Sequence, residues 1–161
     1  MSSDRLHRRG VLVAFLATGA CGFTPVYGPG ASARALRGAV AIAAPDTIPG
    51  FAIRSRLIDR LGAPGEAAYT LDVTLDQALD VAALSQAGDA LRYNVVGAAG
   101  WRLATADGRV IGSGQVENFT SYAATGSTVA TQASATDAIG RLMVILADMI
   151  VAEVMLLDLP A

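Results

Sequence analysis

The sequence predicts an α+β fold, in which the helices and an antiparallel sheet come from separate stretches of the chain. Residues 69–122 contain three successive segments with strand periodicity. An amphipathic helical pattern precedes them, and a long apolar helical pattern follows them. The chain has 161 residues, of which 53% are hydrophobic and 16% charged, and this is the size and composition of one globular domain.

The N-terminus has the three parts of an export signal. Arg8 and Arg9 lie in a charged head, residues 11–17 form an apolar run, and small residues lead to Cys21. The run is too short to cross a bilayer as a helix, which needs about 20 apolar residues. A cysteine at this place is the site that lipoprotein processing uses, because its thiol takes a diacylglycerol before the leader is cut off. We therefore expect a signal peptide over residues 1–20 and a diacylglycerol and an N-acyl chain on Cys21.

Two alternatives stay open for this segment. Thr18 occupies the position where a lipobox usually has leucine, so a plain secretory signal with an incidental cysteine is the competing interpretation. Arg8 and Arg9 also fit a twin-arginine signal, and the sequence does not choose between the two export routes. Gly22, rather than aspartate, follows the cysteine, which favours sorting to the outer membrane.

Residues 21–35 are predicted to be a lipidated tether, because glycine and proline recur there and prevent a helix or a central strand. The folded domain is then expected over residues 36–161. It begins with a short strand in residues 36–44, followed by a helix over residues 50–61. Its apolar side contains Phe51, Leu57, Ile58 and Leu61, and Gly62 and Pro64 end it.

The central part of the domain is predicted to be an antiparallel meander. Apolar residues at 69, 71, 73 and 75 alternate with polar ones, and the pattern extends through Leu79 and Val81. A second strand over residues 91–104 has Tyr93, Val95, Trp101 and Leu103 in phase. The tight hairpin signal at residues 107–108 leads to a third strand over residues 109–122.

The C-terminal helix is predicted over residues 136–156, after a loop over residues 120–136. Ser134 to Asp137 have the spacing of a capping box. The side of the helix that should be polar carries Val144, Val151 and Met155 instead. Either a partner covers this side, or the first helix or the tether packs over it. The core stripe is expected to be Ile139, Leu142, Leu146, Met149, Ile150 and Leu157.

The chain contains few groups that could carry out chemistry. His7 is the one histidine and Cys21 the one cysteine, and there is no lysine, so we expect no metal site, no cofactor and no enzyme. Removal of residues 1–20 takes three of the 12 basic and one of the 14 acidic residues, which leaves a negative chain and argues against nucleic acid. A carboxylate hydrolase remains as an alternative, and it would use two of Asp72, Asp76, Asp80 and Glu117.

Four segments of the sequence resemble the LptE family of lipopolysaccharide-assembly lipoproteins in its alphaproteobacterial form. They are the Cys-Gly-Phe-Thr-Pro-Val-Tyr-Gly start at residues 21–28, the strand at 70–75, the hairpin at 107–108, and the Ser-Tyr-Ala-Ala-Thr-Gly-Ser-Thr-Val-Ala run at 121–130. The likeness covers nearly the whole mature chain in the same order.

The resemblance implies a small α/β sandwich, with two helices on one face of a four-stranded mixed, largely antiparallel sheet. It also implies an outer-membrane lipoprotein that faces the periplasm, plugs the β-barrel translocon LptD, helps it assemble and assists lipopolysaccharide delivery. Members of the family contact lipopolysaccharide through basic residues, and Arg92 and Arg102, in register on one strand face, are our candidates. An accessory lipoprotein of an intermembrane lipid-transport system is the second hypothesis.

Overall fold

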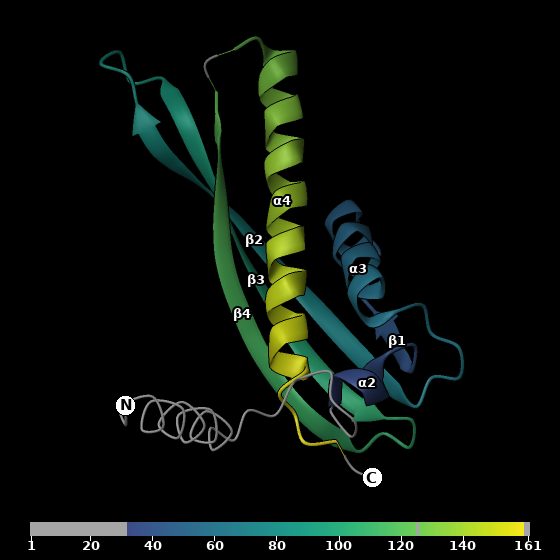
Figure 1. Cartoon of the computed structure of the whole chain (residues 1–161). Helices are drawn as coiled ribbons and strands as arrows, with labels where there is room; N and C mark the ends of the chain where they lie inside the picture. Colours follow the sequence, from purple (N-terminus) through teal and green to yellow (C-terminus); the bar gives the residue numbers. More distant parts are fainter. Residues whose placement is uncertain (1–31, 125, 160–161) are drawn as a thin grey trace, which may run out of the picture.

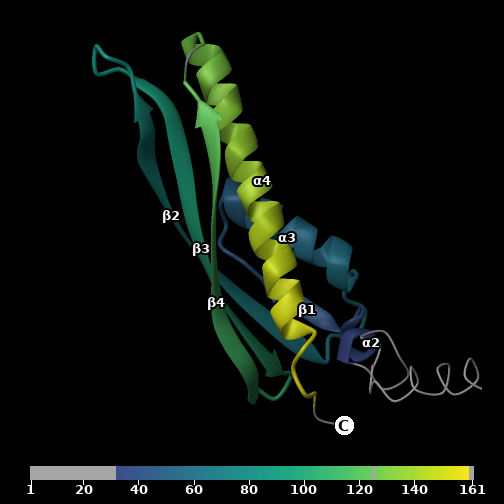
Figure 2. The same cartoon turned by 60° about the vertical axis from the view of Figure 1, so that its left-hand side comes forward.

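The computed structural model describes residues 32–124 and 126–159, so the predicted signal peptide, Cys21 and most of the tether lie outside the described residues. Two layers make up the molecule, with α3 and α4 on the same side of a sheet (Figures 1 and 2). This confirms the α+β class and the layered arrangement. The elements are α2 (Ser32–Leu36), β1 (Val40–Ala43), α3 (Ile48–Leu61), β2 (Tyr69–Leu84), β3 (Ala90–Thr105), β4 (Val110–Ala123) and α4 (Thr128–Val154).

The sheet has the order β1-β2-β3-β4, with β1 parallel to β2 and the other pairs antiparallel. The predicted meander is therefore confirmed; β2 and β3 are two or three residues longer than the pattern predicts, and β4 has the predicted length, shifted by one residue. β1 is much shorter than β2 and pairs with it only from Tyr69 to Asp72. Gly108, with φ at +90°, makes the tight turn between β3 and β4 that the sequence predicts.

Local signals explain the two ends of α3. Thr47 is the N-cap, where its hydroxyl accepts a hydrogen bond from the backbone N–H of Gly50 at 3.1 Å, and Pro49 lies in the first turn. The predicted stop is confirmed, since Gly62 follows with φ at +89° and its N–H donates to the carbonyl of Ile58.

The buried side of α3 differs from the prediction at one position. Phe51 is 71% exposed, whereas Ile53 is fully buried together with Leu57. Ile53 lies four residues before Leu57 and Phe51 lies six before it, so only Ile53 falls on the same helix face. The prediction for Phe51 was wrong because a sheet and a second helix can cover only one stripe of a helix.

The predicted start of the C-terminal helix was wrong by two turns. α4 begins at Thr128, and Ser127 is its N-cap, with a side chain that accepts from the N–H of Ala130 at 3.3 Å. Residues 134–137 are thus inside the helix and do not cap it. Thr136 donates to the carbonyl of Gln132 at 3.0 Å, so this hydroxyl is satisfied within the helix.

One core lies between the helices and the inner face of the sheet. Alternate β3 residues, including Val95, Trp101 and Leu103, point toward the helices, as predicted. Leu57 of α3 and Ile150 of α4 meet them and are fully buried. No charged or polar side chain is buried in the described residues.

Candidate functional site

The two candidate arginines lie on the face of the sheet that the helices leave open. Arg92 and Arg102 are both exposed on β3, where alternate residues share a face. They are ten residues apart, which corresponds to about 33 Å along a strand. Arg102 pairs in register with Asp72 on β2 and Ser113 on β4, whereas Arg92 donates to the hydroxyl of Ser121 at 3.4 Å. They face the same way, but the structure does not bring them together.

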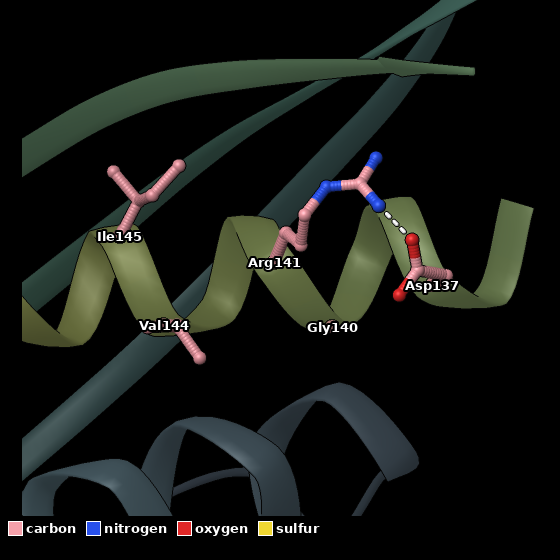
Figure 3. Close-up of a pocket in the computed structure, with 5 residues that line it drawn as sticks. All are labelled: Asp137, Gly140, Arg141, Val144 and Ile145. Atoms are coloured by element: carbon pink, nitrogen blue, oxygen red, sulfur yellow. Dashed lines mark ion pairs between the residues drawn. The ribbon is translucent and has the colours of Figure 1, made fainter. Parts of the chain in front are cut away.

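A different arginine lies close to Arg92. Arg141 of α4 donates from Nη2 to the backbone carbonyl of Ser121 at 3.3 Å, so the two guanidinium groups contact the same residue from β3 and from α4. Arg141 also forms an ion pair with Asp137, one helical turn earlier (Figure 3). The sequence did not single out Arg141 as a contact residue. The missing information was the place of β4 beside α4, which no local pattern reports.

The four carboxylates do not form a paired site. Asp72, Asp76 and Asp80 lie along the open face of β2, and Glu117 is two strands away, with Ala98 in register between it and Asp76. Glu117 accepts a hydrogen bond from Gln115 at 2.7 Å. A shallow hollow of about 310 Å³ on this face is lined by Asp76 and by none of the other three. Acid–base chemistry needs two carboxylates close together, so this arrangement gives no support to hydrolysis.

The two ends of the molecule differ in how far the helices cover the sheet. We define the distal half as residues 77–96, 117–124 and 126–145, and the proximal half as the other described residues. α3 lies beside α4 from about the middle of α4 toward its C-terminal end, and Figures 1 and 2 show α4 and the strands extending beyond α3. The chain enters at α2 and leaves after α4 at the proximal end.

In the proximal half α3 is held firmly on α4. Arg56 of α3 donates from Nε and Nη2 to the two carboxylate oxygens of Asp148 at 3.1 and 2.8 Å, and Arg60 lies 3.6 Å from the same carboxylate. The hydrogen bonds from Arg56 lower the pKa of Asp148 below its ordinary value, and they raise the pKa of Arg56. Val151 is 1% exposed and belongs to the core, so this part of the helix side that should be polar is covered within the fold.

In the distal half the corresponding surface is open. Val144 of α4 is 41% exposed and points toward the region of α3 (Figure 3), and with Gly140 and Ile145 it lines a shallow apolar depression of about 470 Å³. On β2, Leu79 and Val81 are 56% and 53% exposed. The remaining exposed apolar side chains of this half are Leu84, Leu91, Val96, Phe119 and Val129.

A cleft of about 310 Å³ lies between the distal parts of β2 and α4. Its lining has no charged residue, and it includes Leu79 of β2, Val95 of β3 and Ile139 of α4. Its polar groups are the side-chain amides of Gln77 and Gln132 and the hydroxyl of Tyr122. Such a lining favours an apolar, uncharged group over an ion or a sugar.

The part of the chain that the structure describes has neither a cluster of metal ligands nor a membrane-spanning helix. No three side chains of the metal-binding types come together there. Within the same residues, no helix is both long and apolar enough to cross a membrane. The described surface does offer an apolar distal cleft under α4, and Arg92 lies on the opposite, open face of the sheet.

These features describe a small α+β domain with one closed and one open end. The sequence matches the model of the LptE lipopolysaccharide-assembly family over residues 38–154, which is nearly the whole described domain. The chain belongs to this family, and it is a lipopolysaccharide-assembly lipoprotein by class. No curated protein sequence matches it.

Solved structures of similar fold agree with this assignment. A protein from Caulobacter crescentus described as a lipoprotein is 21% identical, with a TM-score of 0.60 over 79% of this chain and 96% of the other. Rare lipoprotein B from Shewanella oneidensis is 14% identical, with a TM-score of 0.56 over 71% and 91%. A minor lipoprotein from Acinetobacter baumannii is 13% identical, with a TM-score of 0.56 over 75% and 96%. At these identities the likeness concerns the fold.

Proposed function

We propose that this chain is anchored in the outer membrane by acyl chains on Cys21, faces the periplasm, and plugs and helps assemble the β-barrel lipopolysaccharide translocon LptD. The family match over residues 38–154 is the observation that carries the proposal. The shape is compatible with it, because α4 has 27 residues and is about 40 Å long, more than the apolar band of an outer-membrane barrel, about 25 Å.

The surface chemistry of the domain supports a role without catalysis. The described residues contain no histidine, cysteine or lysine, so binding through surfaces is the chemistry left to them. The chain enters and leaves at the proximal end, so an anchor on Cys21 would hold that end at the membrane and leave the distal half for a partner.

The test is purification of the barrel with this protein from detergent-solubilised outer membranes. We expect the two to purify together, and we expect depletion of this chain to reduce the amount of folded barrel. A protein that purifies alone, with the barrel at its normal level in depleted cells, would contradict the proposal.

The anchor has a separate test. The Cys21→Ser variant should incorporate no labelled fatty acid and should leave the membrane fraction, whereas the unchanged chain is labelled. If the unchanged protein keeps its signal peptide and carries no acyl chain, the anchor proposal is wrong.

We assign the lipopolysaccharide contact to Arg92 together with Arg141, because both contact Ser121. A phosphate group can accept charge-assisted hydrogen bonds from more than one guanidinium group. Arg102, about 33 Å along the strand from Arg92, is the matched control. Replacing Arg92 and Arg141 by alanine should weaken binding of purified lipopolysaccharide, and replacing Arg102 should not. Equal losses would contradict the assignment.

The second candidate is an accessory lipoprotein of an intermembrane lipid-transport system, and the apolar distal cleft is the observation that favours it. The cleft is about 310 Å³, and the proximal core is closed around Leu57 and Ile150. A carrier must bind one lipid molecule per chain in solution. Stoichiometric extraction of phospholipid from vesicles, with normal barrel assembly in depleted cells, would favour this candidate over the first.

A further inference from the structure

The outer edge of β2 is free over most of its length. β1 pairs with β2 only up to Ala43, opposite Asp72, and the sheet has no other strand on that side in the described residues. Residues 73–84 of β2 therefore continue past the end of β1, and residues 73–81 run without interruption until the register shifts that follow Val81. This uninterrupted edge is about 30 Å long at 3.3 Å per residue.

The backbone of this edge can accept another strand. The N–H of Tyr69 donates to the carbonyl of Ala39, on the β1 side of the strand. Backbone groups alternate in direction along a strand, so those of Leu75, Gln77 and Leu79 point the same way. No hydrogen bond to another described segment uses them. A row of free N–H and C=O groups is the template on which strand addition takes place.

The side chains beside this edge select what can pair with it. On the inner side, Leu79 and Val81 are more than half exposed next to the uncharged cleft under α4. On the outer side, Asp76 and Asp80 are exposed, and neither forms an ion pair with a described residue. A matching strand would therefore be apolar on one side and basic on the other.

The same carboxylates argue against a second copy of this chain. Pairing two β2 edges would bring acidic residues of the same strand face close together, and like charges on paired strands are destabilising. Basic side chains opposite Asp76 and Asp80 would be favourable instead. The occupant is thus a different polypeptide.

The other long edge of the sheet is partly occupied. On β4, the N–H of Phe119 donates to the side-chain oxygen of Asn118 at 2.8 Å, and the carbonyl of Ser121 accepts from Arg141. These side chains use backbone groups that a pairing strand would need. The distal part of the β4 edge is therefore less suited to strand addition than the β2 edge.

We propose that residues 73–81 of β2 bind an extended strand of a partner protein, in line with β1, whose side chains alternate between apolar residues toward α4 and basic residues toward solvent. The strand would cover Leu79 and Val81 and pair with the part of the β2 edge that β1 does not reach. This inference goes beyond the proposed function, because it names a surface and a binding mode that hold whichever protein supplies the strand.

The experiment places a photoreactive phenylalanine analogue at Leu79 or, as a matched control, at Phe119 of the full chain in its native membranes. These side chains are 56% and 59% exposed and lie beside opposite edges of the sheet. We expect Leu79 to cross-link to a segment of another protein whose mapped residues alternate apolar and basic, and Phe119 to give no such product.

Proline variants test the backbone bonds. Gln77→Pro removes one N–H from the free edge of β2. Gln115→Pro makes the same change on β4, because Gln115 lies four residues before Phe119 and its N–H therefore points to the same outer edge. Proline is tolerated where the N–H of an edge strand faces solvent. In the Leu79 cross-linking chain, Gln77→Pro should lower the yield about fivefold or more, and Gln115→Pro should leave it unchanged. The thermal unfolding of both variants shows that they are folded.

Neutral variants test the charge pattern. Asp76→Asn combined with Asp80→Asn should lower the cross-link yield, whereas Asp72→Asn, beside β1, should not. The proposal is overturned if Leu79 cross-links to a second copy of this chain, if neither position or only Phe119 cross-links, or if Gln77→Pro has no effect. A captured strand from a protein other than the barrel would support this inference and count against the proposed function.

Discussion

The proximal and distal halves of this molecule contain the same kind of sheet under the same helix, yet only one of them is closed. Val151 and Val144 lie two turns apart on α4, so they share one side of the helix, but they are 1% and 41% exposed. α3 has 14 residues and α4 has 27, so α3 can lie beside only part of the longer helix (Figure 1). The distal half therefore keeps an apolar surface that no other described part of the fold covers.

The largest expected effect is a difference in stability between a variant of the proximal half and a variant of the distal half. Leu57→Ala empties a fully buried site in the proximal core and should lower the free energy of unfolding by about 2–5 kcal/mol. Leu79→Ala, in the distal half, removes a side chain that is already 56% exposed and should change it by less than about 0.5 kcal/mol. Urea unfolding followed by Trp101 fluorescence measures both. Equal losses would mean that the two halves do not differ as described.

A second prediction locates the start of the distal part of α4. Ser127 caps the helix, so Ser127→Ala should cost about 1 kcal/mol of unfolding free energy. Ser134 lies within the helix, where alanine is the better helix former, so Ser134→Ala should be neutral or slightly stabilising. Thermal unfolding of the two variants checks this. A loss of unfolding free energy in Ser134→Ala and none in Ser127→Ala would indicate that the helix starts near residue 136, as the sequence predicts.

The smallest effect concerns the ion pairs that hold α3 on α4. Arg56 and Asp148 are about one third exposed, so Asp148→Asn should cost about 0.5–1 kcal/mol at neutral pH. Folding lowers the pKa of Asp148, so its contribution is present above the ordinary carboxyl pKa of about 3.9 and is lost as the pH falls through the lowered pKa.

The measurement for this third prediction is the difference in unfolding free energy between the unchanged protein and the Asp148→Asn variant. We expect this difference at neutral pH and expect it to shrink as the pH falls below about 4. A difference that grows on acidification would show that the carboxylate is not stabilised by its arginine partners.

Local patterns predicted most of the fold. Alternation located all three strands of the meander, and glycines at 62 and 108 marked the end of α3 and the turn after β3. The start of α4 was missed because Ser134 to Asp137 satisfy the spacing of a cap while the preceding alanine-rich segment is also helical. Periodicity alone cannot choose between two possible caps on one continuous helix.

The candidate site was less accessible to sequence. Arg92 and Arg102 share a face, as alternation predicts. The alternation does not show that the ten residues between them place the two side chains too far apart for one site. Arg141 joins Arg92 through Ser121, a contact between elements far apart in sequence. The free edge of β2 depends on how soon β1 ends, and that is set by the loop before α3.

Hydrogen exchange of the protein, alone and in the complex purified from outer membranes, tests the account most directly. If the distal half is the surface that a partner covers, backbone amides of residues 73–84 and 128–145 should become protected in the complex. Those of residues 48–61 and 146–154 should exchange as in the free protein. Protection confined to the proximal half, or the absence of any change in β2, would contradict the account.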